Sequence, residues 1–181
     1  PEIKNQNIKL NLKNNELKIS KKNYFLIKNE KEIDSWINEA EDLGEIAIDT
    51  ETNSINPHLA DLVGISLSTK IGKACYIPIG HTFKGCINRD IVLNKLKPML
   101  EDVSIKKIGQ NIKFDFIIFH KYGIKISSME DTMLMSYVLD AGKNRHNMDV
   151  LSEIHLGHKT IKFKDLVGTG KKQINFSEVP L

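Results

Sequence analysis

A short apolar run that ends in two carboxylates constrains the fold of this chain more than any other feature. Ile46-Ala47-Ile48 follows Gly44 and leads into Asp49-Thr50-Glu51. An apolar run of this length, bounded by glycine and polar residues, predicts a buried strand. Side chains at i and i+2 of a strand point to the same face, so Asp49 and Glu51 project together, roughly 7 Å apart by the strand rise.

Two like charges at the edge of a core repel each other unless a positive charge lies between them. A hard cation such as Mg²⁺ fits this need, because it prefers oxygen ligands and often takes only one or two protein carboxylates. The alternative interpretation is that Asp49 caps a turn and that Glu51 is solvated.

Length and composition indicate one globular domain, or one globular domain with an appendage. The chain has 181 residues, of which 40% are hydrophobic, and a net charge of +3 that neither requires nor opposes nucleic-acid binding. No membrane-spanning apolar stretch or signal peptide is present, which favours a cytoplasmic protein. Cys75 and Cys86 lack metal-ligand spacing and are expected to be free thiols. We expect residues 1–20 to form a linker, with a peripheral strand pair as the alternative, and residues 21–181 to form the domain.

The hydrophobic periodicity predicts an α/β architecture, a mixed sheet of about five strands flanked by helices. Asn29 and Asp131 are expected to begin helices, Gly44 to end one, and Asp149 to cap another. The predicted strands are Tyr24–Ile27, Glu45–Thr50, Leu62–Ser68, Ala74–Ile79 and Lys106–Gly109. The predicted helices are Glu30–Leu43, Arg89–Leu100, Ile112–Tyr122, Thr132–Leu139, Met148–Leu156 and Phe163–Val167.

A third carboxylate lies on one of these helices. In Gln110-Asn111-Ile112-Lys113-Phe114-Asp115, the helix that begins near Asn111 places Asp115 on a mostly apolar face. A carboxylate there must be paired or metal-bound, because burying an isolated charge is costly. The alternative is that Asp115 simply complements the helix dipole in the first turn.

Other catalytic motifs are not found. The histidines form no H-E-x-x-H pattern, which makes a zinc-protease type of site improbable. Neither a G-x-S-x-G elbow nor a P-loop occurs, so a serine-hydrolase or nucleotide-cradle function has no support.

The ordered motifs resemble those of the DEDD 3'–5' exonucleases, a superfamily with a ribonuclease H-like fold. The nearest resemblance is to the proofreading exonuclease domain of bacterial family A DNA polymerases, over about Tyr24 to Leu181. It rests on Ile48–Ile55, Leu62–Ser66, Gly109–Asp115, Asp131–Tyr137 and Arg145–Leu151, the last continuing into His158–Phe163.

The resemblance implies roles for particular residues. Asp49, Glu51 and Asp115 would ligate two divalent cations, Mg²⁺ or Mn²⁺ with Zn²⁺ possible in one site, at the terminal phosphodiester. The residues implied to contact the single strand are Thr52, Ile55, Gln110, Asn111, Arg145 and Phe163. The aromatic ring would stack on a base, the aliphatic side chain would wedge against the last bases, and the arginine would support phosphates. The alternatives are that Phe163 is ordinary core, Ile55 closes a turn and Arg145 is a solvated loop charge.

One departure concerns the family's fourth carboxylate, which belongs to a Tyr-x-x-x-Asp motif. No such motif occurs in residues 1–181. We therefore expect a fragment of a longer protein, with weak or no activity for these residues alone, because misplaced groups cost orders of magnitude in rate.

The resemblance thus implies a proofreading module that acts on the 3' end of single-stranded or frayed DNA. The expected partner is a polymerase domain in the same natural chain, and the expected setting is a monomer in the bacterial cytoplasm, near the nucleoid. Two alternatives stay open. One is a catalytically silent domain that holds single-stranded DNA. The other is a ribonuclease D-like exoribonuclease, which would differ from a DNA exonuclease in its contacts to the 2'-OH of the substrate.

Overall fold

The computed structural model describes residues 23–181, so the predicted linker over residues 1–20 lies outside the described residues. The described strands are β1 (Tyr24–Leu26), β2 (Glu45–Thr52), β3 (Leu62–Lys70), β4 (Lys73–Pro78), β5 (Lys106–Gly109) and β6 (Met129–Asp131). The described α-helices are α1 (Glu30–Leu43), α2 (Arg89–Glu101), α3 (Lys113–Lys121), α4 (Thr132–Asp140), α5 (Met148–Leu156) and α6 (Phe163–Val167). The predicted α/β class is confirmed.

The strands form one mixed sheet in the order β1-β4-β3-β2-β5-β6. Short connections make β2, β3 and β4 antiparallel neighbours, whereas β1, β5 and β6 pair in parallel with β4, β2 and β5. The sequence predicts five of these strands. It does not predict β6, because three residues are too few to show the alternation that marks a strand.

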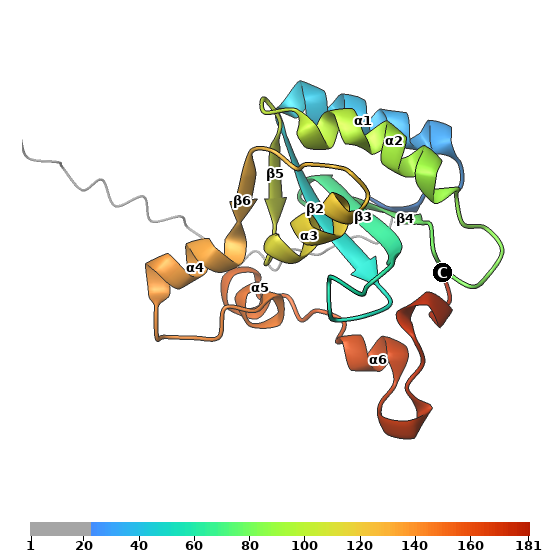
Figure 1. The fold of residues 1–181 in the computed structure, drawn as a ribbon. Helices are drawn as coiled ribbons and strands as arrows, with labels where there is room; N and C mark the ends of the chain where they lie inside the picture. The colour runs from blue at the N-terminus through green and yellow to red at the C-terminus, as the bar shows by residue number, and fades with distance from the viewer. Residues whose placement is uncertain (1–22) are drawn as a thin grey trace, which may run out of the picture.

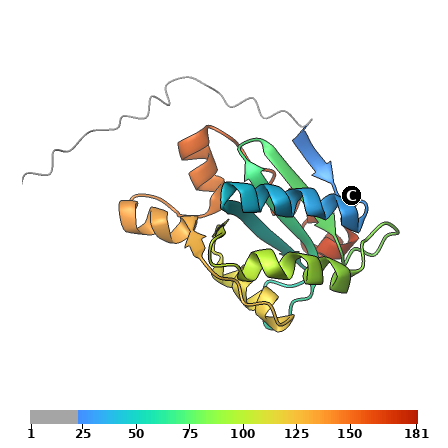
Figure 2. The same ribbon diagram turned by 90° about the horizontal axis from the view of Figure 1, so that it is seen from above.

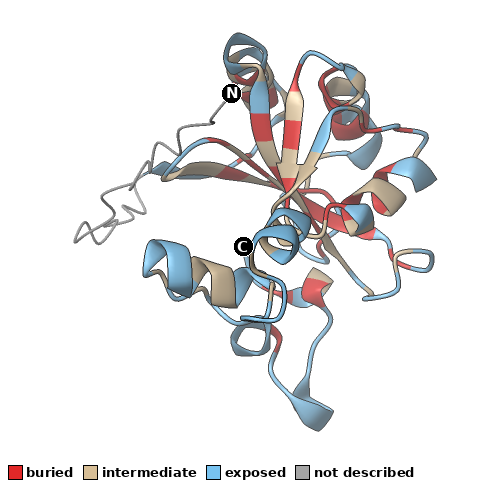
Figure 3. Cartoon of the chain, turned by 90° about the vertical axis from the view of Figure 1, so that its left-hand side faces the viewer, coloured by how far each residue is buried: buried red, intermediate tan, exposed pale blue. Residues whose placement is uncertain are grey.

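Helices α1 and α2 lie side by side over one face of the sheet (Figures 1 and 2). On β2, Ile46, Ile48 and Thr50 are buried on the helix-covered side, and they alternate with half-buried Ala47, Asp49 and Glu51. Figure 3 shows buried residues gathered along the sheet and under α1 and α2. Helices α4 and α5 have no buried residues. We call the opposite side, which carries Asp49 and Glu51, the polar face of the sheet.

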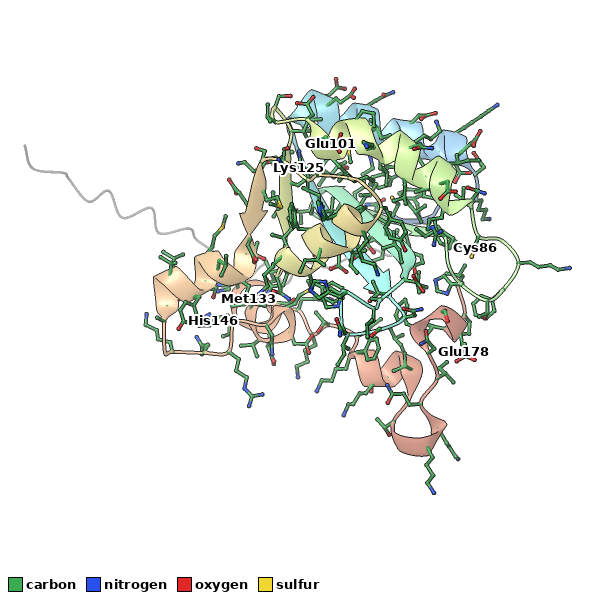
Figure 4. The ribbon with its side chains drawn as sticks, in the orientation of Figure 1. Cys86, Glu101, Lys125, Met133, His146 and Glu178 are labelled. Atoms are coloured by element: carbon green, nitrogen blue, oxygen red, sulfur yellow. The ribbon has the colours of Figure 1, made fainter. Side chains whose placement is uncertain are left out.

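A second, small apolar cluster attaches the last described residues to β3. Val63 packs with Val167, Phe176 and Val179. The Ser177 carbonyl accepts a hydrogen bond from the Thr82 N–H at 2.9 Å. Phe176–Glu178 form a short 3₁₀ helix, and Glu178, labelled in Figure 4, closes a capping box with Asn175 at its start. These contacts bring residues 163–181 next to the end of β2.

The predicted helix signals are mostly confirmed. The side chains of Asn29 and Asp131 cap α1 and α4, and Gly44 ends α1 with a φ of 70°. The prediction for Asp149 is wrong. Asn147 caps α5, and the Asp149 carboxylate instead accepts a hydrogen bond from the Thr160 hydroxyl. None of the helices in residues 23–181 is long and apolar enough to cross a membrane.

Candidate active site

Two of the three predicted acids lie on the central strand β2. Asp49 pairs across the ladder with Ser66, and Glu51 pairs with Gly64. Both carboxylates are half-buried on the polar face of the sheet. The alternative of a turn cap at Asp49 and a solvated Glu51 is therefore wrong.

Asp115 approaches the same strand from α3. It is 2% exposed, in the first turn of the helix. Its Oδ1 accepts hydrogen bonds from the Thr50 N–H at 2.9 Å and from the Thr50 hydroxyl at 2.6 Å. Asp115 thus lies in the first turn of α3, where a carboxylate complements the helix dipole. Its burial and its two hydrogen bonds to Thr50 show that this is not its only role. Thr50 stands between Asp49 and Glu51, so one strand segment holds all three acids together.

The three acids disturb one another electrostatically. Burial, then the charges of Asp49 and Asp115, raise the pKa of Glu51 to about 7. Burial raises the pKa of Asp115 to about 7, and the charge of Asp49 adds to this rise while the Thr50 hydrogen bonds oppose it. Burial also raises the pKa of Asp49. Acids with strongly raised pKa values in a cleft mark a candidate functional site.

A cavity of about 430 Å³ opens beside Glu51. It brings together three of the predicted nucleotide contacts, Thr52, Ile55 and Phe163. Ile55 is 95% exposed and Phe163 is 53% exposed, which excludes an ordinary core role for the aromatic ring. We call this space the nucleotide cavity.

The sequence does not predict two residues that line the nucleotide cavity, Phe176 and Asn175. The ring of Phe176 stacks on that of Phe163, with centroids 6.0 Å apart and an interplanar angle of 11°. Asn175 donates from Nδ2 to the Asn53 carbonyl at 3.0 Å. Nothing local in the sequence marks either residue, because both reach the cavity through the docking of a distant segment on β3.

Gln110 and Asn111 lie at the end of β5, on the other side of β2. Gln110 lines a cavity of about 250 Å³ with Asp49, and its Nε2 donates to the His146 carbonyl at 2.7 Å. Asn111 adopts a φ of 59°, a left-handed conformation that asparagine tolerates better than most residues. Its N–H donates to the Asp131 carboxylate at 3.0 Å, a role of Asp131 that the sequence does not reveal.

Arg145, unlike Gln110 and the predicted contacts in the nucleotide cavity, does not lie in a cavity beside the acids. It is exposed between α4 and α5 and lines neither of the two cavities described above. Its neighbour His146, labelled in Figure 4, receives the Gln110 hydrogen bond. Arg145 is therefore exposed near the Gln110 side of the site, and its contact with phosphates stays a prediction.

A family model described as 3'-5' exonuclease matches residues 24–179. The chain belongs to this 3'-5' exonuclease family. It is a nuclease domain of the kind found in DNA polymerase I, with hydrolase chemistry on nucleic acid, as the resemblance of its motifs implies.

Curated relatives and solved structures agree with this assignment. The DNA polymerase I of Pseudomonas aeruginosa is 40% identical over 164 residues, which cover 87% of this chain and 18% of that protein. The exonuclease domain thus spans less than a fifth of the length of this relative. Brucella melitensis NrnC with bound Mg²⁺ has a TM-score of 0.56 at 25% identity, covering 82% of this chain and 67% of that one. Escherichia coli RNase D has a TM-score of 0.61 at 20% identity, covering 83% and 39%, which shows a shared fold.

The acids of the exonuclease domain fit a divalent cation by their chemistry rather than by a preformed geometry. Within residues 23–181, no group of three or more His, Cys, Asp or Glu side chains has a geometry that could hold a metal ion without rearrangement. The donors are nevertheless all oxygen atoms, and none of the three acids forms an ion pair with another described residue. A hard cation among them would relieve the repulsion that raises their pKa values.

Proposed function

We propose that this exonuclease domain removes nucleotides from the 3' end of single-stranded DNA. The observation that carries the proposal is that Glu51 belongs both to the set of three interacting acids and to the lining of the nucleotide cavity. A terminal nucleotide held against Phe163 would place its phosphodiester at the acids. Base stacking on an aromatic ring is tolerant of sequence, which suits stepwise degradation.

The residues of the domain bind and orient the reactants. Phe163 and Ile55 hold the last base, and Thr52 and Asn111 position the terminal nucleotide. Asp49, Glu51 and Asp115 would hold two divalent cations, Mg²⁺ or Mn²⁺, with Zn²⁺ as the alternative in one site. Divalent ions held there would supply activation of a water molecule and neutralisation of charge on the leaving oxygen. The water oxygen bonds to phosphorus as the bond between phosphorus and the 3' oxygen breaks. The water loses a proton, and the 3' oxygen gains one and leaves as a hydroxyl on the shortened strand.

Three observations on relatives support this proposal. The solved NrnC structure contains Mg²⁺, another structure of the same protein is bound to pGG, and the curated homologues are DNA polymerases. The homologues lead us to propose that a polymerase domain shares the natural chain. We propose further that the domain acts as a monomer and that it works on DNA at the nucleoid in the cytoplasm.

The test is cleavage of a 5'-labelled single-stranded DNA with Mg²⁺ or Mn²⁺. Because no Tyr-x-x-x-Asp motif occurs in residues 1–181, the chain is assayed beside a longer version that carries the family's fourth acidic motif. We expect the longer version to shorten the strand from its 3' end, and residues 1–181 to act weakly or not at all.

Variants of the longer version assign the acids. Asp49→Ala and Asp115→Ala should each lower the rate by more than about 100-fold, since even the loss of an outer partner of a metal ligand costs 10- to 100-fold. Asp42→Ala, an exposed acid on α1, is the matched control and should retain the wild-type rate. Full activity of Asp49→Ala would sink the proposal. Binding of DNA without cleavage would favour a silent DNA-holding domain, and preference for an RNA strand would favour an exoribonuclease.

A further inference from the structure

Tyr76 of β4 lies across the sheet from Glu51, on the same polar face. Tyr76 pairs with Ser66 on β3, and Ser66 pairs with Asp49 on β2. The tyrosine ring does not stand upright over its own partner but lies over Gly64. A Cβ atom built at Gly64 would be only 1.9 Å from the Tyr76 hydroxyl oxygen and 2.5 Å from the ring atom Cε2. Any side chain at Gly64 would therefore displace this ring.

The position of Gly64 brings the tyrosine hydroxyl beside the proposed metal ligand. Gly64 is the ladder partner of Glu51. Tyr76 and Glu51 also line one cavity of about 540 Å³. Burial raises the pKa of Tyr76, and the charge of Glu51 raises it further. The hydroxyl and the carboxylate therefore face one cavity, from the two sides of Gly64.

His81 holds the hydroxyl in this place. Its Nε2 lies 2.7 Å from the Tyr76 oxygen, and the histidine is only 9% exposed. The imidazole packs against the rings of Phe83 and Phe176, with centroids 5.8 Å and 6.0 Å away. Its Nδ1 makes no hydrogen bond of good geometry with the described residues. The imidazole is thus fixed by packing on two sides, and it anchors the hydroxyl end of the tyrosine that lies over Gly64.

Glu51 itself lacks such support. Its carboxylate makes no hydrogen bond within the described part of the chain, unlike Asp115, which two donors of Thr50 hold. Ligating carboxylates are in general oriented by hydrogen bonds from outer partners. We propose that Tyr76, anchored by His81 and given room by Gly64, is a positioning residue that orients the Glu51 carboxylate for metal binding. This inference rests on the proposed function, because it assumes that Glu51 is a metal ligand.

The experiment measures Mn²⁺ binding to the chain by electron paramagnetic resonance, which needs no catalytic activity. The variants are Tyr76→Phe, Glu51→Gln and the double variant, with Tyr137→Phe as the matched control. Tyr76→Phe removes only the hydroxyl and keeps the ring over Gly64. Tyr137 is 59% exposed on α4, and its ring also contacts a histidine, His146. Thermal unfolding of every variant checks that the fold is retained.

We expect Tyr76→Phe to weaken Mn²⁺ binding about 10-fold or more, in the range found for outer partners of metal ligands. Tyr137→Phe should bind like the wild type. Because Tyr76 acts through Glu51, adding Tyr76→Phe to Glu51→Gln should change nothing more. Additive losses, or a Tyr76→Phe variant that binds like Tyr137→Phe, would overturn the inference alone. Unchanged binding in Glu51→Gln would overturn the proposed metal site, and the inference with it.

Discussion

Thr50 determines where the third carboxylate lies. Both of its donors, the backbone N–H and the hydroxyl, bond to the same Asp115 oxygen. The backbone donor comes from the strand that carries Asp49 and Glu51, so the position of Asp115 relative to them is set by the strand itself. The hydroxyl adds a bond that a substitution can remove without disturbing the ladder.

Thr50→Val should therefore destabilise the chain in a pH-dependent way. At pH 8 the Asp115 carboxylate is ionised, and loss of a hydrogen bond to a charged group should lower the free energy of unfolding by about 1.5–3 kcal/mol. At pH 5, below the pKa of about 7, Asp115 is protonated and the loss should be smaller. Urea unfolding at the two pH values measures both. Thr50→Ser keeps the hydroxyl and is the control. A loss that is larger at pH 5 would contradict this account.

Asp131 joins two helices, α3 and α4, to the end of β5. Its carboxylate caps α4 through the N–H groups of Met133 and Leu134. It also accepts from the N–H groups of Asn111 and Ile112, at 3.0 Å and 3.1 Å, just before α3 begins. The turn that presents Asn111 and leads to Asp115 is thus held by a side chain from a strand that the sequence does not predict.

Asp131→Ala should cost more than the loss of an ordinary cap. An N-cap substitution costs about 0.5–2 kcal/mol, and two further bonds to the carboxylate raise the expected loss to about 2–4 kcal/mol. Asn147→Ala is the comparison, because this residue caps only α5 through the Val150 N–H. Its loss should be about 1 kcal/mol. Chemical denaturation of both variants tests the difference, and equal losses would show that Asp131 acts only as a cap.

Sequence patterns predict helix α1 well but do not predict the burial of Lys107. Helix α1 has both the apolar spacing and the caps, so its bounds follow from the sequence. The burial of Lys107 cannot be predicted from the sequence in this way. A lysine is expected in solvent, yet this one is fully buried, and its ammonium donates to the Asp102 and Ile105 carbonyls, each at 2.6 Å, beyond the end of α2. Such a partner set is made by tertiary packing and leaves no local signal.

For the molecule as a whole, the two faces of the sheet have different tasks. The helix-covered face is apolar and supplies most of the core, whereas the polar face carries Asp49, Glu51 and Tyr76. The acids could be found from the sequence, because strand alternation and a helix face place them. Phe176, Tyr76 and His81 could not, because their places depend on a glycine across the ladder and on the docking of residues 163–181.

This arrangement makes stability of the metal-free chain depend on pH. Glu51 and Asp115 have pKa values of about 7 in the fold, against roughly 4 in an unfolded chain. Between pH 4 and 7 the folded state therefore holds more protons than the unfolded state, and stability falls as the pH rises. Two other groups change the stability in other pH ranges or in the opposite direction. Glu39 has a pKa of about 2 and therefore affects stability only at lower pH. Burial lowers the pKa of His81, so this group stabilises the folded state as the pH rises.

Comparison with a variant separates these contributions. In EDTA, the melting temperature of the wild type relative to Glu51→Gln should fall between pH 5 and pH 8 by more than about 3 °C, since 1 kcal/mol corresponds to about 2–4 °C at this size. Mg²⁺ or Mn²⁺ at pH 8 should restore the wild type and leave Glu51→Gln less changed, because a ligand that binds only the folded state stabilises it. Asp42→Asn, on the opposite side of the sheet, should follow the wild type. If Glu51→Gln showed the same pH dependence and the same metal response as the wild type, the strained group of acids would not be the origin of either effect.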